Sequence, residues 1–170
     1  GYNFEDKTVV LGNDIDLNGG GSNRWTPIGR YNDESGSDTT YSFNGTFDGQ
    51  GHTISGLYID TEPENPDIHM NISGFQGLFG RVGEQGTIKN LALDGEIIAN
   101  NNSGSFAAEN KGTIENCYST VKIHVVAQNG GSGGIAGENS GTIRNCYFAG
   151  EAVIQAYGYF AGICYDNNRG

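Results

Sequence analysis

The sequence predicts an all-β solenoid, a right-handed parallel β-helix of about five coils, each with about 25–29 residues and three short strands. The pattern Gly-Thr-Ile-x-Asn occurs at residues 86–90, 112–116 and 141–145, so its copies start 26 and 29 residues apart. The chain holds 29 glycines against 3 prolines, which suits frequent turns. No stretch keeps apolar residues at helical spacing for two turns, and parallel crossovers are right-handed in nearly all known folds.

The strands can be assigned in chain order. Residues 9–17 fit the repeat loosely and would open the first coil. Residues 53–60 fit it better, because Ile54, Leu57 and Ile59 fall in the inward columns. The three Gly-Thr-Ile-x-Asn copies open the remaining coils, and each continues through a bend into another strand. Polar residues alternate with the apolar ones, which is the pattern of a strand with one buried face.

A second recurring element combines small and apolar residues, at 77–80, 104–110, 133–139 and 158–162. Small residues allow coils to stack closely. We therefore expect their larger side chains to form another inward column: Phe79, Phe106, Ile135 and Phe160.

Within the Gly-Thr-Ile-x-Asn copies, the isoleucines fall in one column and the asparagines in another: Ile88, Ile114 and Ile143, and Asn90, Asn116 and Asn145. Stacked coils lie about 4.8 Å apart, so the amides can bond along the stack as an internal ladder. A row of asparagines that contacts a ligand is the alternative.

We expect residues 1–170 to form one domain, with long loops near residues 19–38 and 60–72, where the repeat fails. The chain starts at Gly1 without an initiator methionine or signal peptide, and its last repeat is cut short. These features predict a segment of a longer protein. Further coils of the same parent chain would then be its nearest partners.

The charge of the chain disfavours two classes of partner. Its formal net charge is −11 and its pI is near 4.4, with only 9 lysines and arginines. Nucleic acids and anionic membranes both attract basic surfaces. The sequence also contains no run of eighteen apolar residues, so we predict no membrane insertion.

Several motifs in order resemble bacterial extracellular proteins with the GLUG motif. The matching stretches are residues 25–29 (Trp-Thr-Pro-Ile-Gly), 43–54 and 77–80 (Gly-Leu-Phe-Gly), followed by the Gly-Thr-Ile-x-Asn-Cys-Tyr units. The resemblance implies a right-handed β-helix in a secreted or cell-wall-anchored protein, commonly an adhesin-like one. The motif also occurs in IgA-specific metallopeptidases. It brings no catalytic residues, because the motif is structural.

We expect no catalytic site in this segment. His52, His69 and His124 are far apart and form no His-Glu-x-x-His zinc motif. The nucleophile elbow of hydrolases and the P-loop are also missing from the sequence. Carboxylates are numerous, but no spacing pairs them as a glycosidase requires, so we interpret them as solvated surface acids.

Asp14-x-Asp16-x-Asn18-Gly19 resembles the first half of an EF-hand calcium loop. The twelfth position is Trp25 rather than glutamate, and a strand would place both aspartates on its solvent face. We favour the structural interpretation. The alternative is a calcium site formed by Asp14, Asp16 and Asn18, and no other cofactor is predicted.

Cys117 and Cys146 fall in one inward column on successive coils, and Cys164 is a third cysteine. We interpret them as buried thiols that pack as small apolar side chains. A disulfide between the first two and a metal site are the alternatives.

Aromatic side chains are the best candidates for binding. Exposed aromatics stack on sugar rings or anchor a protein partner. In the alternative interpretation, the tryptophan packs under its own loop and the tyrosines form a stabilising outer ladder. The candidates in or near the N-terminal loop are Trp25, Tyr31, Tyr41 and Tyr58. The outward pair in the repeats is Tyr118 and Tyr147.

The sequence therefore predicts a non-enzymatic adhesion or stalk module of a bacterial cell-surface or secreted protein. Its partner would be a host glycan or an extracellular protein. One alternative is an accessory region of a large secreted enzyme, either an IgA-type metallopeptidase or a carbohydrate-active protein. The other alternative is a spacer stabilised by calcium.

Overall fold

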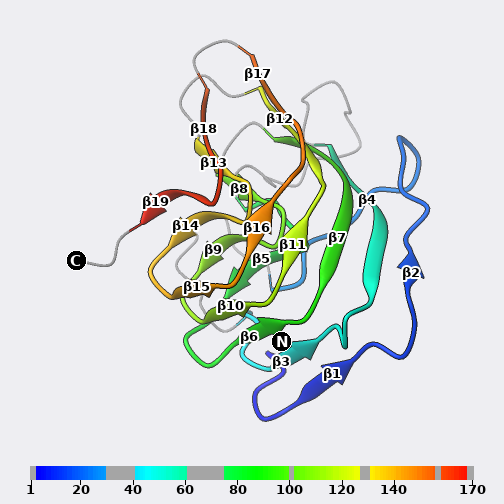
Figure 1. The fold of residues 1–170 in the computed structure, drawn as a ribbon, viewed down its shortest axis with the longest axis vertical. Helices are drawn as coiled ribbons and strands as arrows, with labels where there is room; N and C mark the ends of the chain where they lie inside the picture. The colour runs from blue at the N-terminus through cyan, green and yellow to red at the C-terminus, as the bar shows by residue number, and fades with distance from the viewer. Residues whose placement is uncertain are drawn as a thin grey trace.

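The computed structural model describes residues 3–29, 41–60, 75–99, 102–126, 131–155 and 158–167. Within these ranges the chain forms nineteen short strands. No described segment forms an apolar helix of the length that a membrane crossing needs. Figure 1 shows the chain winding around a common axis, so that strands far apart in the sequence lie side by side.

The strands form four sheets, and each coil adds strands to them. The first sheet contains β1 (Thr8–Val10), β3 (Thr46–Asp48), β6 (Thr87–Lys89), β10 (Thr113–Glu115) and β15 (Thr142–Arg144). The second contains β2 (Ile15–Asp16), β4 (Thr53–Asp60), β7 (Ala92–Ala99), β11 (Tyr118–Ser119), β12 (Lys122–Val125), β16 (Tyr147–Phe148) and β17 (Ala152–Ile154). The third contains β8 (Ser103–Gly104), β13 (Gly131–Gly133) and β18 (Tyr159–Ala161). The fourth contains β5 (Phe79–Val82), β9 (Ala107–Asn110), β14 (Ala136–Asn139) and β19 (Cys164–Asn167).

The pairing confirms a parallel β-solenoid of about five coils. Thr113 lies in register with Thr87 on one side and with Thr142 on the other, and both pairs of strands are parallel. The Gly-Thr-Ile-x-Asn period is therefore the length of one coil. The first coils are longer, since Thr8 pairs with Thr46, and Thr46 pairs with Thr87.

The structure shortens the first predicted loop. Residues 19–29 follow the coil rather than leaving it: the Gly19 amide donates to Gly56, the Trp25 amide donates to Tyr58, and Ile28 bridges to Phe79. The rest of that prediction, and most of the second predicted loop, lie outside the described residues. The sequence repeat is not visible over residues 19–29, although the coil continues there. The hydrogen bonds that hold this segment come from backbone groups, which need no particular side chain.

Each regular coil contains four strand positions rather than the predicted three. The predicted small–apolar–small strand is divided by a sharp bend, as between β8 and β9 and between β13 and β14. Small residues allow the bend: a Cβ atom on Gly104 would lie 2.4 Å from the Ala107 carbonyl oxygen. A side chain cannot fit there, so the chain turns where the sequence offers glycine.

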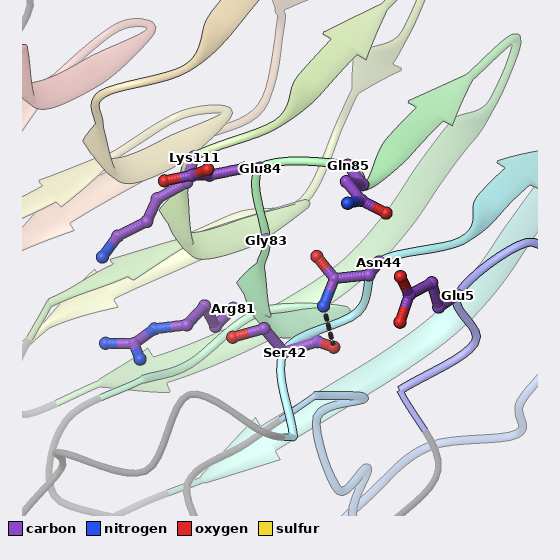
Figure 2. A pocket seen from close by; sticks show the side chains of 8 residues that line it. All are labelled: Glu5, Ser42, Asn44, Arg81, Gly83, Glu84, Gln85 and Lys111. Atoms are coloured by element: carbon purple, nitrogen blue, oxygen red, sulfur yellow. Dashed lines mark hydrogen bonds between the residues drawn. The ribbon is translucent and has the colours of Figure 1, made fainter.

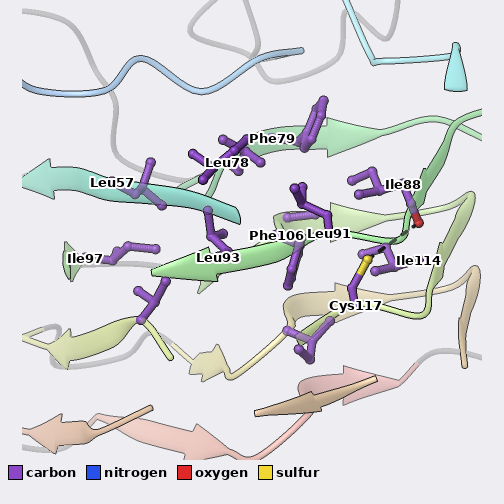
Figure 3. Close-up of a cluster of buried hydrophobic side chains, with 14 of the residues drawn as sticks. Leu57, Leu78, Phe79, Ile88, Leu91, Leu93, Ile97, Phe106, Ile114 and Cys117 are labelled. Atoms are coloured by element: carbon purple, nitrogen blue, oxygen red, sulfur yellow. Dashed lines mark hydrogen bonds between the residues drawn. The ribbon is translucent and has the colours of Figure 1, made fainter. Parts of the chain in front are cut away.

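The core consists of apolar columns that run along the solenoid (Figure 3). Ile88 and Ile114 are fully buried, as the repeat predicts, while Ile143 in the fifth coil is half-buried. Phe79 anchors the N-terminal part of the core, with ring centroids 4.8 Å from Phe43 and 5.6 Å from Phe47. Aromatic contacts at these distances add to the free energy of apolar burial.

The predicted asparagine ladder exists, but it lies outside the core. The Asn116 side chain donates to Asn90 and the Asn145 side chain donates to Asn116, each over 3.2 Å. Asn116 and Asn145 are exposed. All three asparagines have φ near +53°, at the corner between the first and second sheets. Asparagine tolerates this left-handed conformation better than most residues, and the corner turns its side chain outward, so the prediction of an internal position was wrong.

A second asparagine ladder lies inside and was not predicted. The Asn110 amide donates to Asn139 over 2.7 Å, and the Asn139 amide donates to Asn167 over 3.0 Å. Asn110 is completely buried and Asn139 nearly so. These residues end β9, β14 and β19, where the recurring Glu-Asn pairs were the available sequence signal. The two ladders tie successive coils together on both sides of the first sheet.

Candidate functional site

A small open cavity of about 160 Å³ lies between the first and second coils and has two of the predicted aromatic residues in its wall. Trp25 comes from the segment after β2, and Tyr58 lies on the outward face of β4. The cavity is lined by Leu17, Gly19, Asn23, Arg24, Trp25, Gly56 and Tyr58. The structure therefore brings together residues that are far apart in the sequence.

Backbone contacts hold the tryptophan in this cavity wall. The Trp25 amide donates to the Tyr58 carbonyl over 2.7 Å, and the indole N–H donates to the Leu78 carbonyl over 3.0 Å. The ring is half-buried and packs against the core. The Trp25 ring thus packs against the core, and it offers a ligand a ring surface rather than a hydrogen bond.

Polar groups at the same cavity lie on Arg24 and Tyr58. The Arg24 guanidinium pairs with Asp60 over 2.8 Å, and both side chains are largely buried. Burial raises the pKa of the Tyr58 phenol, and the nearby Asp60 and Glu96 charges raise it further. The phenol therefore keeps its proton, which the hydrogen bond to Asp60 also favours. An aromatic wall beside a guanidinium and a phenol can contact both the apolar and the hydroxyl faces of a sugar.

The outward tyrosines of the repeats stack on each other. The Tyr118 and Tyr147 rings are nearly parallel, with centroids 5.1 Å apart and an angle of 4° between their planes. They are 38% and 55% exposed. Because the two rings cover each other's facing sides, this geometry supports the outer-ladder interpretation. Of the other aromatic candidates, Tyr41 is half-buried beside Gly29, and Tyr31 lies outside the described residues.

The calcium candidates contact different partners. Asp14 accepts the Thr53 amide over 3.0 Å and lies 3.1 Å from His52 Nδ1. The Thr53 hydrogen bond first, and then His52, lowers the pKa of Asp14. Asp16 instead accepts the Asn18 amide over 2.8 Å, closing a local turn. Across the described ranges, no three acids, histidines or cysteines are placed so that they could hold a metal ion together, and calcium binding by Asp14, Asp16 and Asn18 stays a prediction.

A larger polar cavity of about 260 Å³ lies where the fourth sheet turns into the first. Figure 2 shows Arg81 and Lys111 on one side of it, with Asn44 on the other. Both cations bind Glu109, Lys111 over 3.1 Å and Arg81 through Nε. Sequence reasoning missed this cavity, because its remaining lining residues come from several segments: Glu5, Ser42, Gly83, Glu84 and Gln85.

Beside this cavity, carboxylates stack on three successive coils. Glu138 lies in register with Glu109 on one side and with Asp166 on the other, and Arg81 covers the far side of Glu109. Burial raises the pKa of Glu138, and repulsion from Glu109 and Asp166 raises it further, against the opposing effect of Arg81 and Lys111. The ionised form of Glu138 is therefore less stable in the folded protein than in the unfolded chain.

Replacing Glu138 with glutamine should raise the melting temperature at pH 7, because the amide removes the repulsion and can still accept the Asn102 hydrogen bond. Because the pKa of Glu138 is higher in the folded protein than in the unfolded chain, Glu138 contributes stability that is fully present below its ordinary pKa of 4.5. This contribution is lost as the pH rises through the folded-state pKa. The stabilisation by Glu138→Gln should therefore vanish below about pH 4. Thermal melts from pH 3 to pH 8 measure this, with the exposed Glu84→Gln as control. A destabilised Glu138→Gln protein at pH 7 would contradict the argument.

Comparison with known proteins identifies distant relatives of this chain but does not assign it to a family. No model of a known protein family matches the chain, and no solved structure matches it. The chain is 37% identical over 100 residues to halomucin of Haloquadratum walsbyi, a match that covers 58% of this chain and 1% of halomucin. It is 32% identical over 123 residues to the "Putative Gly-rich membrane protein" of Evansella cellulosilytica, covering 68% of this chain and 12% of that protein. The chain thus spans a small part of each relative that it matches.

Proposed function

We propose that this solenoid is a non-enzymatic stalk and adhesion module of a large bacterial cell-surface or secreted protein, with a glycan as its ligand. The observation that carries the proposal is the parallel register of the first sheet through five coils, reinforced by an asparagine ladder on either side of that sheet. Stacked coils of this kind form a stiff body whose length grows with the number of coils. Such a body can hold a binding surface away from the rest of a long chain.

The distant relatives support this proposal. Halomucin matches over only 1% of its length, so a segment like this one is a minor part of a very large protein. The name of the second relative places that protein at a membrane. The GLUG-like motifs support the same class, an adhesin-like β-helix outside the cell. The exposed apolar side chains of the fifth coil, Ile154, Tyr159 and Ile163 among them, suit the stacking of further coils.

The Trp25–Tyr58 cavity is the binding site that we propose for the glycan. Its volume of about 160 Å³ is on the scale of a single sugar ring, and its wall combines ring surfaces with the Arg24–Asp60 pair. Sugar recognition uses these two kinds of contact together. The stacked Tyr118–Tyr147 pair offers a sugar less ring surface, because each ring already covers one face of the other.

A glycan array tests the proposal directly. The labelled full chain should bind at least one class of oligosaccharide, and Tyr58→Ala should weaken that binding roughly tenfold, as expected for one lost aromatic contact. Tyr147→Ala is the matched control, since Tyr147 is also an outward tyrosine of the second sheet and should leave binding unchanged. No signal above background, or equal losses in both variants, would rule out a glycan site at this cavity.

A further inference from the structure

Cys117 and Cys146 occupy the same corner on the fourth and fifth coils. Each directly follows an asparagine of the outer ladder and precedes a tyrosine of the stacked pair. The next residues, Tyr118 and Tyr147, are paired in register, and the Tyr147 amide donates to the Cys117 carbonyl over 3.2 Å. The two cysteines are therefore direct neighbours along the solenoid axis.

The spacing of the coils brings the two sulfur atoms within reach of each other. In-register residues of adjacent parallel strands lie about 4.8 Å apart, inside the range of about 4.4–6.8 Å between the Cα atoms of disulfides. The two thiols are also close enough for each to shift the pKa of the other. Each sulfur lies 3.2 Å from the carbonyl oxygen two residues earlier, so both side chains point the same way. A disulfide therefore requires a rotation of at least one side chain and a closer approach of the two coils, because the Cβ atoms of a disulfide lie about 3.5–4.5 Å apart.

The two cysteines differ in access and in acidity. Cys117 is buried, whereas Cys146 is half-buried in the fifth coil. The hydrogen bond from Cys117 stabilises the Cys146 thiolate and lowers the pKa of Cys146 to about 7, although burial and the Glu115 carboxylate act against it. Glu115 is itself paired with Arg144, which moderates the repulsion. The same hydrogen bond and burial raise the pKa of Cys117.

We propose that Cys117 and Cys146 form a reactive dithiol, which a peroxide converts into a disulfide between the fourth and fifth coils. The Cys146 thiolate attacks one peroxide oxygen and breaks the O–O bond, giving a sulfenic acid and, after protonation, one water. The Cys117 sulfur then attacks Cys146 Sγ, and the displaced hydroxide takes the Cys117 proton and leaves as a second water. Two thiols are oxidised to one disulfide, and one peroxide is reduced to two waters.

Cys164 is an internal control for this chemistry. It lies in β19, in register with Ala136 rather than with another cysteine. Burial raises the pKa of the Cys164 thiol above its ordinary value of 9.0, and the Asp166 carboxylate raises it further. Alkylation with iodoacetamide should therefore reach half its maximal rate near pH 7 at Cys146 and only above pH 9 at Cys164.

Mass spectrometry of the full chain after treatment with hydrogen peroxide tests the proposal. The intact protein should lose two hydrogen atoms and regain them with a reductant. Cleavage after Lys122, Arg144 and Glu151 separates the three cysteines, and one peptide pair should join Cys117 to Cys146. The Cys164→Ser variant should keep this cross-link and Cys117→Ser should lose it. A cross-link to Cys164 instead, no cross-link at all, or equal alkylation of Cys146 and Cys164 at pH 7 would overturn the proposal.

Discussion

Replacing Gly112 with alanine is expected to lower the free energy of unfolding by about 3 kcal/mol, which corresponds to a fall of about 6–12 °C in melting temperature. A Cβ atom at this position would lie 2.1 Å from the Gly86 carbonyl oxygen and 2.5 Å from the Gly83 carbonyl oxygen. Both are backbone atoms of the preceding coil, so no side chain can move aside. The two coils would have to separate locally. Thermal and chemical unfolding monitored by circular dichroism measure the effect.

The matched controls are Gly12→Ala and Gly20→Ala. Nothing lies within 4 Å of a Cβ atom at either position, so both variants should unfold within about 0.5 kcal/mol of the original protein. If Gly112→Ala were as stable as these controls, the coils would not stack as closely as described here. The glycine of the repeat would then have another role.

Replacing Phe79 with alanine is expected to cost about 3–5 kcal/mol of stability, the usual range for a fully buried phenylalanine. The ring is completely buried in β5 and contacts both Phe43 and Phe47. Its loss removes apolar burial and also leaves a cavity between the first three coils. Denaturant titration of the variant gives the change in free energy of unfolding.

Tyr159→Ala is the control for this truncation, because Tyr159 is an aromatic residue that is 58% exposed. Its loss should change the stability by about 1 kcal/mol or less. A small effect of Phe79→Ala, similar to that of Tyr159→Ala, would mean that Phe79 is not a core residue. It would also place the small–apolar–small element outside the core.

The fold class could be predicted from the sequence because the spacing of the repeats indicates which residues align on adjacent coils. The isoleucines at 88 and 114 recur one coil apart and face inward. Phe79, Phe106, Ile135 and Phe160 were expected in a second inward column, and the first three are fully buried while Phe160 is half-buried. The column itself was predicted only in part, because Phe79 lies in register with Ala107 and Phe160 with Ser132. The isoleucines could be assigned because their periodicity depends only on the length of a coil.

The corners of the coil could not be predicted in the same way. The sequence shows that an asparagine recurs at positions 90, 116 and 145, but not that the backbone there adopts a positive φ, which turns the side chain outward. Likewise, the bend at Gly104 depends on the distance to Ala107 and Ala136, and distances across coils cannot be read from spacing. The predicted three strands per coil became four for this reason.

The candidate sites were predictable only in part. Trp25 and Tyr58 were candidates by residue type, and the pairing of the first two coils is what places both at one cavity. The Arg81 cavity had no comparable signal, since nothing in the sequence aligns Arg81 with Glu109 until the register of β5 and β9 is known. A site formed by side chains from several coils depends on insertions whose lengths vary, and sequence periodicity does not describe these insertions.

Nuclear Overhauser effects between adjacent coils test the central claim, that the Gly-Thr-Ile-x-Asn copies stack in parallel register. In-register neighbours on strands about 4.8 Å apart give strong cross-peaks between backbone protons. We predict such cross-peaks between Thr87 and Thr113 and between Thr113 and Thr142, together with those of the flanking pairs in the same order. Cross-peaks in the reverse order or in a shifted register would contradict parallel stacking of the copies. The absence of cross-peaks between the copies in a folded sample would contradict it as well.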